Sequence, residues 1–182
     1  SACATARTVA ADQLPRHRIV SIRSVADISR LNVIDAELDA EQRLTAHEEV
    51  EDLRAAIERL PAEVTLSFVP YAEGLQGWID LARAQGHEVM LEMPMEPTGY
   101  PNNDPGPYTL LPNADAADVQ AKMNWLLGRA TGYFGVTNYL ADRFITSEEG
   151  VAAFMTVLRQ RGVAFLDDGS MNRRPGAWAR AS

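Results

Sequence analysis

The chain has 182 residues, of which 46% are hydrophobic and 23% charged, so its composition is that of a globular domain and excludes a disordered chain. Its formal net charge of −8 at pH 7 gives an acidic surface that repels phosphate backbones, and we expect no nucleic-acid binding. The single cysteine, Cys3, excludes an intramolecular disulfide and cysteine-rich zinc sites. No apolar run reaches the roughly 18 residues of a membrane-spanning helix, so no transmembrane segment is predicted in this chain.

The first 60 residues carry the weaker signals. Residues 1–17 are rich in Ala, Thr and Arg and show no apolar period, which predicts a tail or linker. A first strand is expected at Leu31–Asp35 (LNVID), and Arg18–Ile22 (RIVSI) is the alternative. Thr45 and Glu48 form a capping box that predicts a helix leading into the next strand. The apolar positions of that helix are Val50, Leu53, Ile57 and Leu60.

From residue 60 onward, strand and helix patterns alternate. Apolar and β-branched runs predict strands at Val64–Val69 (VTLSFV), Val89–Met93 (VMLEM), Tyr133–Thr137 (YFGVT) and Val163–Asp167 (VAFLD). Apolar residues at helical spacing predict helices at Glu73–Gln85, at Asp115–Arg129, and from a Thr146–Glu149 capping box to Gly162. Pro94–Pro112 is a loop, because its prolines and glycines sustain neither a helix nor a strand ladder. The alternation predicts an α/β domain with parallel strands and right-handed crossovers.

Several conspicuous residues have structural interpretations that need no ligand. His87 lies at the start of its strand, and we expect its ring to bond backbone groups there. Trp78 and Trp125 lie on apolar helix stripes and are predicted to pack in the core against the sheet. The Asn103–Gly106 segment (NDPG) is typical of a turn. The Asp167–Asp168 pair at a strand end is expected to cap its loop, with metal binding as the alternative.

Polar side chains follow the predicted strands at the points where the strands end. The carboxyl ends of parallel strands meet at one edge of a sheet, where α/β proteins bind their ligands. Carboxylates, an amide and phenols are therefore expected to gather at that edge. The residues concerned are Asp35, Tyr71, Glu92, Asn138, Tyr139, Asp167 and Asp168.

Four segments carry a resemblance to a known family. Gly86 and His87 are followed at 88–111 by EVMLEMPMEPTGYPNNDPGPYTLL. The shorter segments are Leu60–Leu66 (LPAEVTL) with Pro70–Ala72 (PYA), Gly135–Tyr139 (GVTNY) and Phe165–Asp168 (FLDD). Over roughly residues 58–170, the chain resembles the divergent polysaccharide deacetylase family, typified by the YibQ-like proteins. The resemblance implies a distorted, incomplete (β/α) barrel of the NodB type. Residues 18–170 would form this single domain, and 171–182 a tail beyond which further barrel elements are missing.

The chemistry implied by the resemblance is hydrolysis of an N- or O-acetyl group on a sugar. Such an enzyme uses a metal to polarise the carbonyl and activate water, together with a carboxylate base and an acid for the leaving group. The family pattern has paired aspartates at the end of the first strand. It has one histidine at the end of the PMEP strand and another in an Asn-His-Met-Gly-Ser motif.

This chain departs from the family pattern at each of these positions. Glu92 stands in place of the first histidine, Tyr139 in place of the second, and Asp35 followed by Ala36 in place of the paired aspartates. Borderline metal ions favour imidazole ligands, whereas two carboxylates at a wet edge hold a divalent ion weakly. The prediction is therefore either no metal or a weakly bound divalent metal at Asp35 and Glu92.

The sequence leaves three functions open. The first is a degenerate member of carbohydrate metabolism that binds glycan, either peptidoglycan or exopolysaccharide, without turnover. The second is an active metal-dependent carbohydrate deacetylase with a non-standard ligand set. The third is a non-enzymatic envelope scaffold that docks a protein partner through the Pro-rich loop.

The resemblance places the protein in the periplasm or cell envelope of a bacterium, and a single cysteine is compatible with that location. The candidate catalytic residues are Asp35, Glu92, Asp167 and Asp168. The candidate glycan-binding residues are Tyr71, Asn102, Asn103, Asp104, Asn138 and Tyr139.

Overall fold

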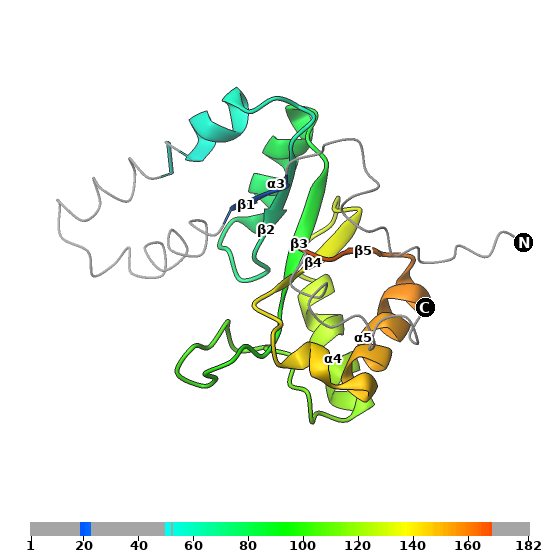
Figure 1. Ribbon diagram of the computed structural model, residues 1–182. Coiled ribbons are helices and arrows are strands. Elements are labelled where there is room, and N and C mark those ends of the chain that lie inside the picture. Colours follow the sequence, from blue (N-terminus) through cyan, green and yellow to red (C-terminus); the bar gives the residue numbers. More distant parts are fainter. Residues whose placement is uncertain (1–18, 23–49, 52, 169–182) are drawn as a thin grey trace, which may run out of the picture. The chain divides into compact units, whose positions relative to one another are not determined.

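The computed structural model describes residues 19–22, 50–51 and 53–168 (Figure 1). These residues fall into two compact units, each of which is described by itself. The described part of the amino-terminal unit lies within residues 17–91 and 129–133, and that of the carboxy-terminal unit within 92–128 and 134–182. Strand β3 (Val89–Pro94) begins in the first unit and ends in the second.

The amino-terminal unit is built on parallel strands. β1 (Ile19–Ile22) pairs with β2 (Thr65–Phe68), and β2 pairs with the first residues of β3. Leu66 of β2 lies opposite Val89 of β3. All four residues of β2 are buried, as expected of a parallel strand covered on both faces.

The position of β1 corrects the expected first strand. The strand beside β2 is Ile19–Ile22, which is the alternative, and not Leu31–Asp35. The physical reason is composition, because LNVID contains Asn32 and Asp35, residue types that are depleted in strands, whereas IVSI is almost wholly apolar. Asp35 itself and the Thr45–Glu48 capping box lie outside the described residues, as do the two predicted tails.

The helices of the amino-terminal unit follow the predicted apolar stripes. Residues 50–51 and 53–59 are helical, and Leu53 and Ile57 in this segment are buried. α3 (Leu75–Ala84) buries the stripe that includes Trp78, which confirms that this tryptophan belongs to the core. Gly86 follows α3 with φ 90°, a conformation that glycine adopts without the penalty of a Cβ atom.

The carboxy-terminal unit contains the second half of β3, followed in the sheet by β4 (Gly135–Tyr139) and β5 (Ala164–Leu166). β4 and β5 are parallel, with Val136 opposite Phe165. α4 (Ala116–Leu127) and α5 (Glu148–Arg161) pack against each other (Figure 1). The ring of Phe154 in α5 meets Phe165 edge to face at 5.3 Å between centroids, so α5 covers the sheet face that carries Phe165.

The helix starts in this unit are capped by side chains. Asp115 accepts a hydrogen bond from the backbone N–H of Asp118 at 2.7 Å, which begins α4 as predicted. α5 begins one residue later than expected, because its cap is the Ser147 hydroxyl, which accepts from the N–H of Gly150 at 3.0 Å. The predicted cap, Thr146, instead donates its hydroxyl to the Arg143 carbonyl at 2.8 Å within the short 3-10 helix η2 (Phe144–Thr146).

Trp125 does not pack in the core as predicted. Its ring is half-buried and stacks on Tyr108 of the Pro-rich loop, with centroids 3.7 Å apart and planes 6° from parallel. The Trp125 ring therefore packs on the Pro-rich loop.

Parallel strands joined by helices make this an α/β fold, as predicted, and the described elements are consistent with an incomplete barrel of the deacetylase type. In the part of the chain that the structure describes, no helix has the length and apolar character needed to cross a bilayer.

Candidate functional site

The carboxyl ends of β3, β4 and β5 lie side by side in the carboxy-terminal unit, and we call this region the carboxyl edge. The N–H of Met95, directly after β3, donates to the carbonyl of Tyr139 at the end of β4 at 3.0 Å. The side chain of Asn138 bonds Asp168, directly beyond β5. The structure thus brings together two of the predicted site residues, Asn138 and Asp168, whereas Tyr139, the next residue of β4, points to the opposite face of the sheet.

Asn138 and Asp168 form a reciprocal pair. The Asn138 amide Nδ2 donates to the Asp168 carboxylate at 2.8 Å, and the Asp168 backbone N–H donates to the Asn138 Oδ1 at 3.0 Å. Asn138 is 3% exposed, so the pair satisfies a buried amide at both ends. This geometry supports the loop-capping interpretation for Asp168, while its neighbour Asp167 is half-buried.

Glu92 lies on a different sheet face from Asn138. In a parallel pair, the donor of a ladder bond lies opposite the residue after the acceptor. For example, Leu66 donates to Glu88 and lies opposite Val89. The Met95–Tyr139 bond therefore sets Met95 opposite Leu140, and counting back sets Glu92 opposite Thr137. Alternate residues of a strand point to opposite faces, so Glu92, which is 2% exposed, is not part of the Asn138–Asp168 cluster.

A clamp that sequence reasoning missed holds the carboxyl edge together. The Glu96 carbonyl accepts from the N–H groups of Arg143 (3.0 Å) and Phe144 (3.1 Å), and the Glu96 carboxylate lies 3.1 Å from the Arg143 Nε. Glu96 is buried, whereas the Arg143 side chain is 60% exposed. The partners are 47 positions apart in sequence, and no local pattern relates them. The clamp fixes the start of the Pro-rich loop against the turn that follows β4.

Leu140, directly after Tyr139, has φ 65°, and it is the only non-glycine residue with positive φ in the described part of the chain. Leucine in this left-handed region costs roughly 1–2 kcal/mol. We expect Leu140→Val to lower the free energy of unfolding by about 1–2 kcal/mol, because a β-branched side chain tolerates this conformation poorly. Leu140→Gly should change it by less than about 1 kcal/mol, since relief of strain offsets lost contacts. Urea unfolding measures both, and equal losses in the two variants would contradict the strain.

Most of the remaining predicted glycan-binding residues lie on the Pro-rich loop. Asn102 and Asn103 are exposed on the Pro-rich loop. Asp104 is also exposed, and its carboxylate accepts from the N–H of Gly106 at 2.9 Å, which supports the turn interpretation for this residue. Tyr71 is half-buried after β2 in the amino-terminal unit.

The described residues do not fit the metal centre that the family pattern implies. No group of three His, Cys, Asp or Glu side chains among them is placed to hold an ion. His87, the one histidine in the described part, is 4% exposed, with Nδ1 2.9 Å from the Val64 carbonyl and Nε2 3.0 Å from the Ile57 carbonyl. Both ring nitrogens therefore face backbone, as predicted, and neither is available to a metal.

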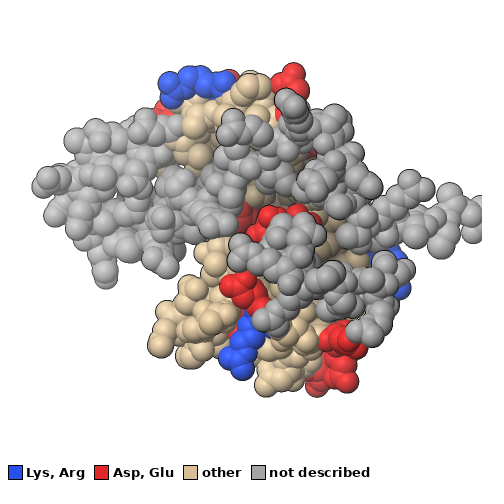
Figure 2. Space-filling model, viewed as in Figure 1, with Lys and Arg blue, Asp and Glu red and all other residues tan. Residues whose placement is uncertain are grey.

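The described residues on one face of the molecule carry more acidic than basic groups. On the face shown in Figure 2, acidic side chains form separate patches among uncharged surface, with few basic groups between them. A neutral ligand is more compatible with such a surface than a phosphate-rich one.

Two comparisons identify relatives of uncharacterized function. The chain is 38% identical to an uncharacterized protein from Agrobacterium tumefaciens C58 whose crystal structure matches it with a TM-score of 0.65. That match covers 71% of this chain and 53% of the Agrobacterium chain. An uncharacterized protein from Haemophilus influenzae is 24% identical over 119 residues, which are 65% of this chain and 42% of that protein. The chain thus spans about half the length of these relatives.

The family model of the divergent polysaccharide deacetylases matches residues 49–180, which include the carboxyl edge, the Pro-rich loop and all the described helices. The chain belongs to the divergent polysaccharide deacetylase family.

Proposed function

We propose that this protein binds polysaccharide at the carboxyl edge and the neighbouring Pro-rich loop, and that it does not hydrolyse acetyl groups by the family's metal-assisted route. Family membership supports a carbohydrate ligand. The side chains at the metal-ligand positions of the family pattern support binding without turnover, because its two histidine positions hold Glu92 and Tyr139 in this chain.

The observation that carries this proposal is the commitment of the acidic and imidazole groups to structure. Asp168 is bonded to Asn138, Glu96 is paired with Arg143, and Glu92 is buried within β3. His87 is held by two backbone carbonyls. A deacetylase needs a carboxylate base within hydrogen-bond reach of a water and a metal ligand set beside it. No group of three His, Cys, Asp or Glu side chains among the described residues is placed to form such a ligand set.

The loop supplies groups suited to sugar hydroxyls. Residues 98–104, which we call the loop tip, include the exposed amides of Asn102 and Asn103. Tyr139, half-buried at the end of β4, offers an aromatic ring of the kind that packs against a sugar face. We further propose, from family membership, that the ligand is peptidoglycan or exopolysaccharide and that the protein acts in the bacterial envelope.

Calorimetric titration with N-acetylated chitooligosaccharides and peptidoglycan fragments, in EDTA and again with added Zn²⁺, tests the proposal. We expect binding that changes less than twofold between the two conditions, because no metal takes part. Tyr139→Ala should weaken binding about three- to tenfold, the equivalent of about 0.5–1.5 kcal/mol for one aromatic contact. Thr156→Ala, an exposed change on α5, is the matched control and should bind as the unchanged protein does. Absence of binding to every fragment in both conditions would overturn the proposal.

A further inference from the structure

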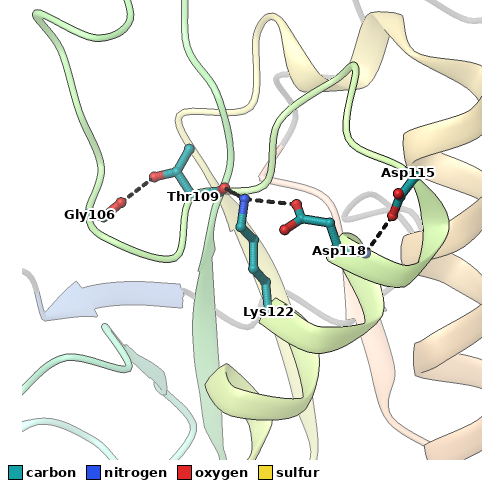
Figure 3. Close-up of polar contacts among 5 residues, drawn as sticks. All are labelled: Gly106, Thr109, Asp115, Asp118 and Lys122. Carbon is teal, nitrogen blue, oxygen red and sulfur yellow. Dashed lines mark hydrogen bonds and ion pairs between the residues drawn. The ribbon is translucent and has the colours of Figure 1, made fainter.

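The chain uses lysine once. Of its 17 cationic residues only Lys122 is a lysine, and all others are arginine. In the structure the Lys122 Nζ lies 2.9 Å from an Asp118 carboxylate oxygen and 3.1 Å from the Thr109 carbonyl oxygen (Figure 3). Its side chain is 20% exposed. The ammonium group of Lys122 therefore joins α4 to Thr109, in the second half of the Pro-rich loop.

The contact continues from Thr109 to the loop tip. The Thr109 hydroxyl donates to the Gly106 carbonyl at 2.7 Å and lies 3.3 Å from the Asp104 carboxylate (the Gly106 contact is drawn in Figure 3). The same carboxylate accepts from the N–H of Gly106 at 2.9 Å. A continuous chain of bonds thus runs from Lys122 to Asp104, the last residue of the loop tip.

A second anchor lies directly beside the first. Trp125 stacks on Tyr108, the residue before Thr109. Asp118, Lys122 and Trp125 are spaced i, i+4, i+7, which sets them on one face of α4. That face holds two consecutive loop residues, one through a ring and one through a backbone carbonyl.

We propose that Lys122 is a positioning residue that holds the loop tip in the geometry needed to bind glycan. The inference rests on the proposed function and names no contact between Lys122 and the ligand. An ammonium is compact and has three donors on one atom, so it reaches two acceptors about 3 Å away in a part-buried space. A guanidinium is planar and larger, so we expect it to hold the same two acceptors less well than the ammonium does.

Three variants test the proposal. Lys122→Met removes the charge, and Lys122→Arg keeps it in a different shape. Arg161→Met is the matched control, because Arg161 bonds Asn124 of the same helix at 2.7 Å but does not contact the loop in the described bonds. Each variant is measured by hydrogen exchange of residues 106–110, by thermal unfolding, and by glycan titration at a temperature where the protein is fully folded.

We expect exchange at residues 106–110 to become at least tenfold faster in both Lys122 variants and to stay unchanged in Arg161→Met. Glycan affinity should fall at least fivefold in both Lys122 variants, while the midpoint of thermal unfolding falls by no more than about 4 °C. If Lys122 acted only through its charge, Lys122→Arg would keep the exchange rate and the glycan affinity of the unchanged protein. That result would overturn the proposal. Unchanged exchange overturns it, and so does faster exchange with unchanged affinity.

The test separates this inference from the proposed function. If the unchanged protein binds no glycan, the proposed function fails. Faster exchange would then still uphold Lys122 as the residue that holds the loop, and unchanged exchange would reject both ideas.

Discussion

Replacing Phe154 with alanine is expected to lower the free energy of unfolding by about 3–5 kcal/mol. Phe154 is fully buried, and its ring meets Phe165 at 5.3 Å and Phe144 at 6.4 Å in edge-to-face geometry. The substitution removes both aromatic contacts and leaves a cavity between α5, β5 and η2. Because β5 pairs with β4 and leads directly into Asp168, the loss should also loosen the carboxyl edge.

Urea unfolding followed by circular dichroism measures the effect of Phe154→Ala. Thr156→Ala on the exposed face of the same helix is the control and should stay within about 0.5 kcal/mol of the unchanged protein. A loss below about 1.5 kcal/mol for Phe154→Ala would mean that α5 is not packed on β5 as the structure has it.

Replacing His87 with alanine is expected to cost about 2–4 kcal/mol, because the buried ring fills the space between two carbonyl oxygens and its N–H donates to one of them. The Ile57 carbonyl would ordinarily accept from the N–H of residue 61, but residue 61 is proline and has none. The His87 Nε2 stands at 3.0 Å in place of that donor, while Nδ1 lies 2.9 Å from the carbonyl of Val64, the residue before β2. One imidazole thus joins the end of the 53–59 helix to the start of the sheet.

His87→Gln provides the matched comparison. A glutamine amide carries N–H donors and can restore the hydrogen bond to a carbonyl but not the volume of the ring, so we expect it to recover about half of the loss. Thermal unfolding of both variants measures this. Equal destabilisation by alanine and glutamine would show that ring volume, and not the hydrogen bonds, is what matters at His87.

Local sequence signals located most of the elements after residue 60. β2 and β3 lie within the predicted runs or extend one residue past them, because buried parallel strands are continuous apolar stretches bounded by Pro and Gly. α4 begins next to Asp115, where the predicted helix starts, and α5 ends before Gly162, which has the left-handed conformation expected of a helix end. These features depend on neighbours in the sequence, and the sequence therefore predicts them.

Features that depend on distant partners could not be predicted. The Met95–Tyr139 bond sets the register of β3 against β4, and only that register shows that Glu92 and Asn138 lie on different faces. A strand buried on both faces has no alternation of polar and apolar residues from which to read its orientation. Trp125 likewise lies on an apolar stripe, yet it is only half-buried and its ring stacks on Tyr108, 17 positions earlier.

The candidate site was predicted only in part, because some of its contacts also join residues that are distant in the sequence. The rule that ligands bind at the carboxyl ends of parallel strands placed Asn138 and Asp168 together and Tyr139 at the same edge, on the other face of β4. It could not reveal the Glu96–Arg143 clamp or the contacts of Lys122, which join the Pro-rich loop to elements that are remote in sequence.

Acetate release is the measurement that tests the central claim most directly. The protein is freed of metal with EDTA, supplied in turn with Zn²⁺, Mn²⁺ and Co²⁺, and incubated with acetylated chitooligosaccharide and acetylated xylan. The account predicts that acetate never exceeds the level of the chelated control, although the same preparation still binds glycan. Acetate that rises with one of these ions and disappears on chelation would contradict it, because it would require a ligand set that the described residues do not provide.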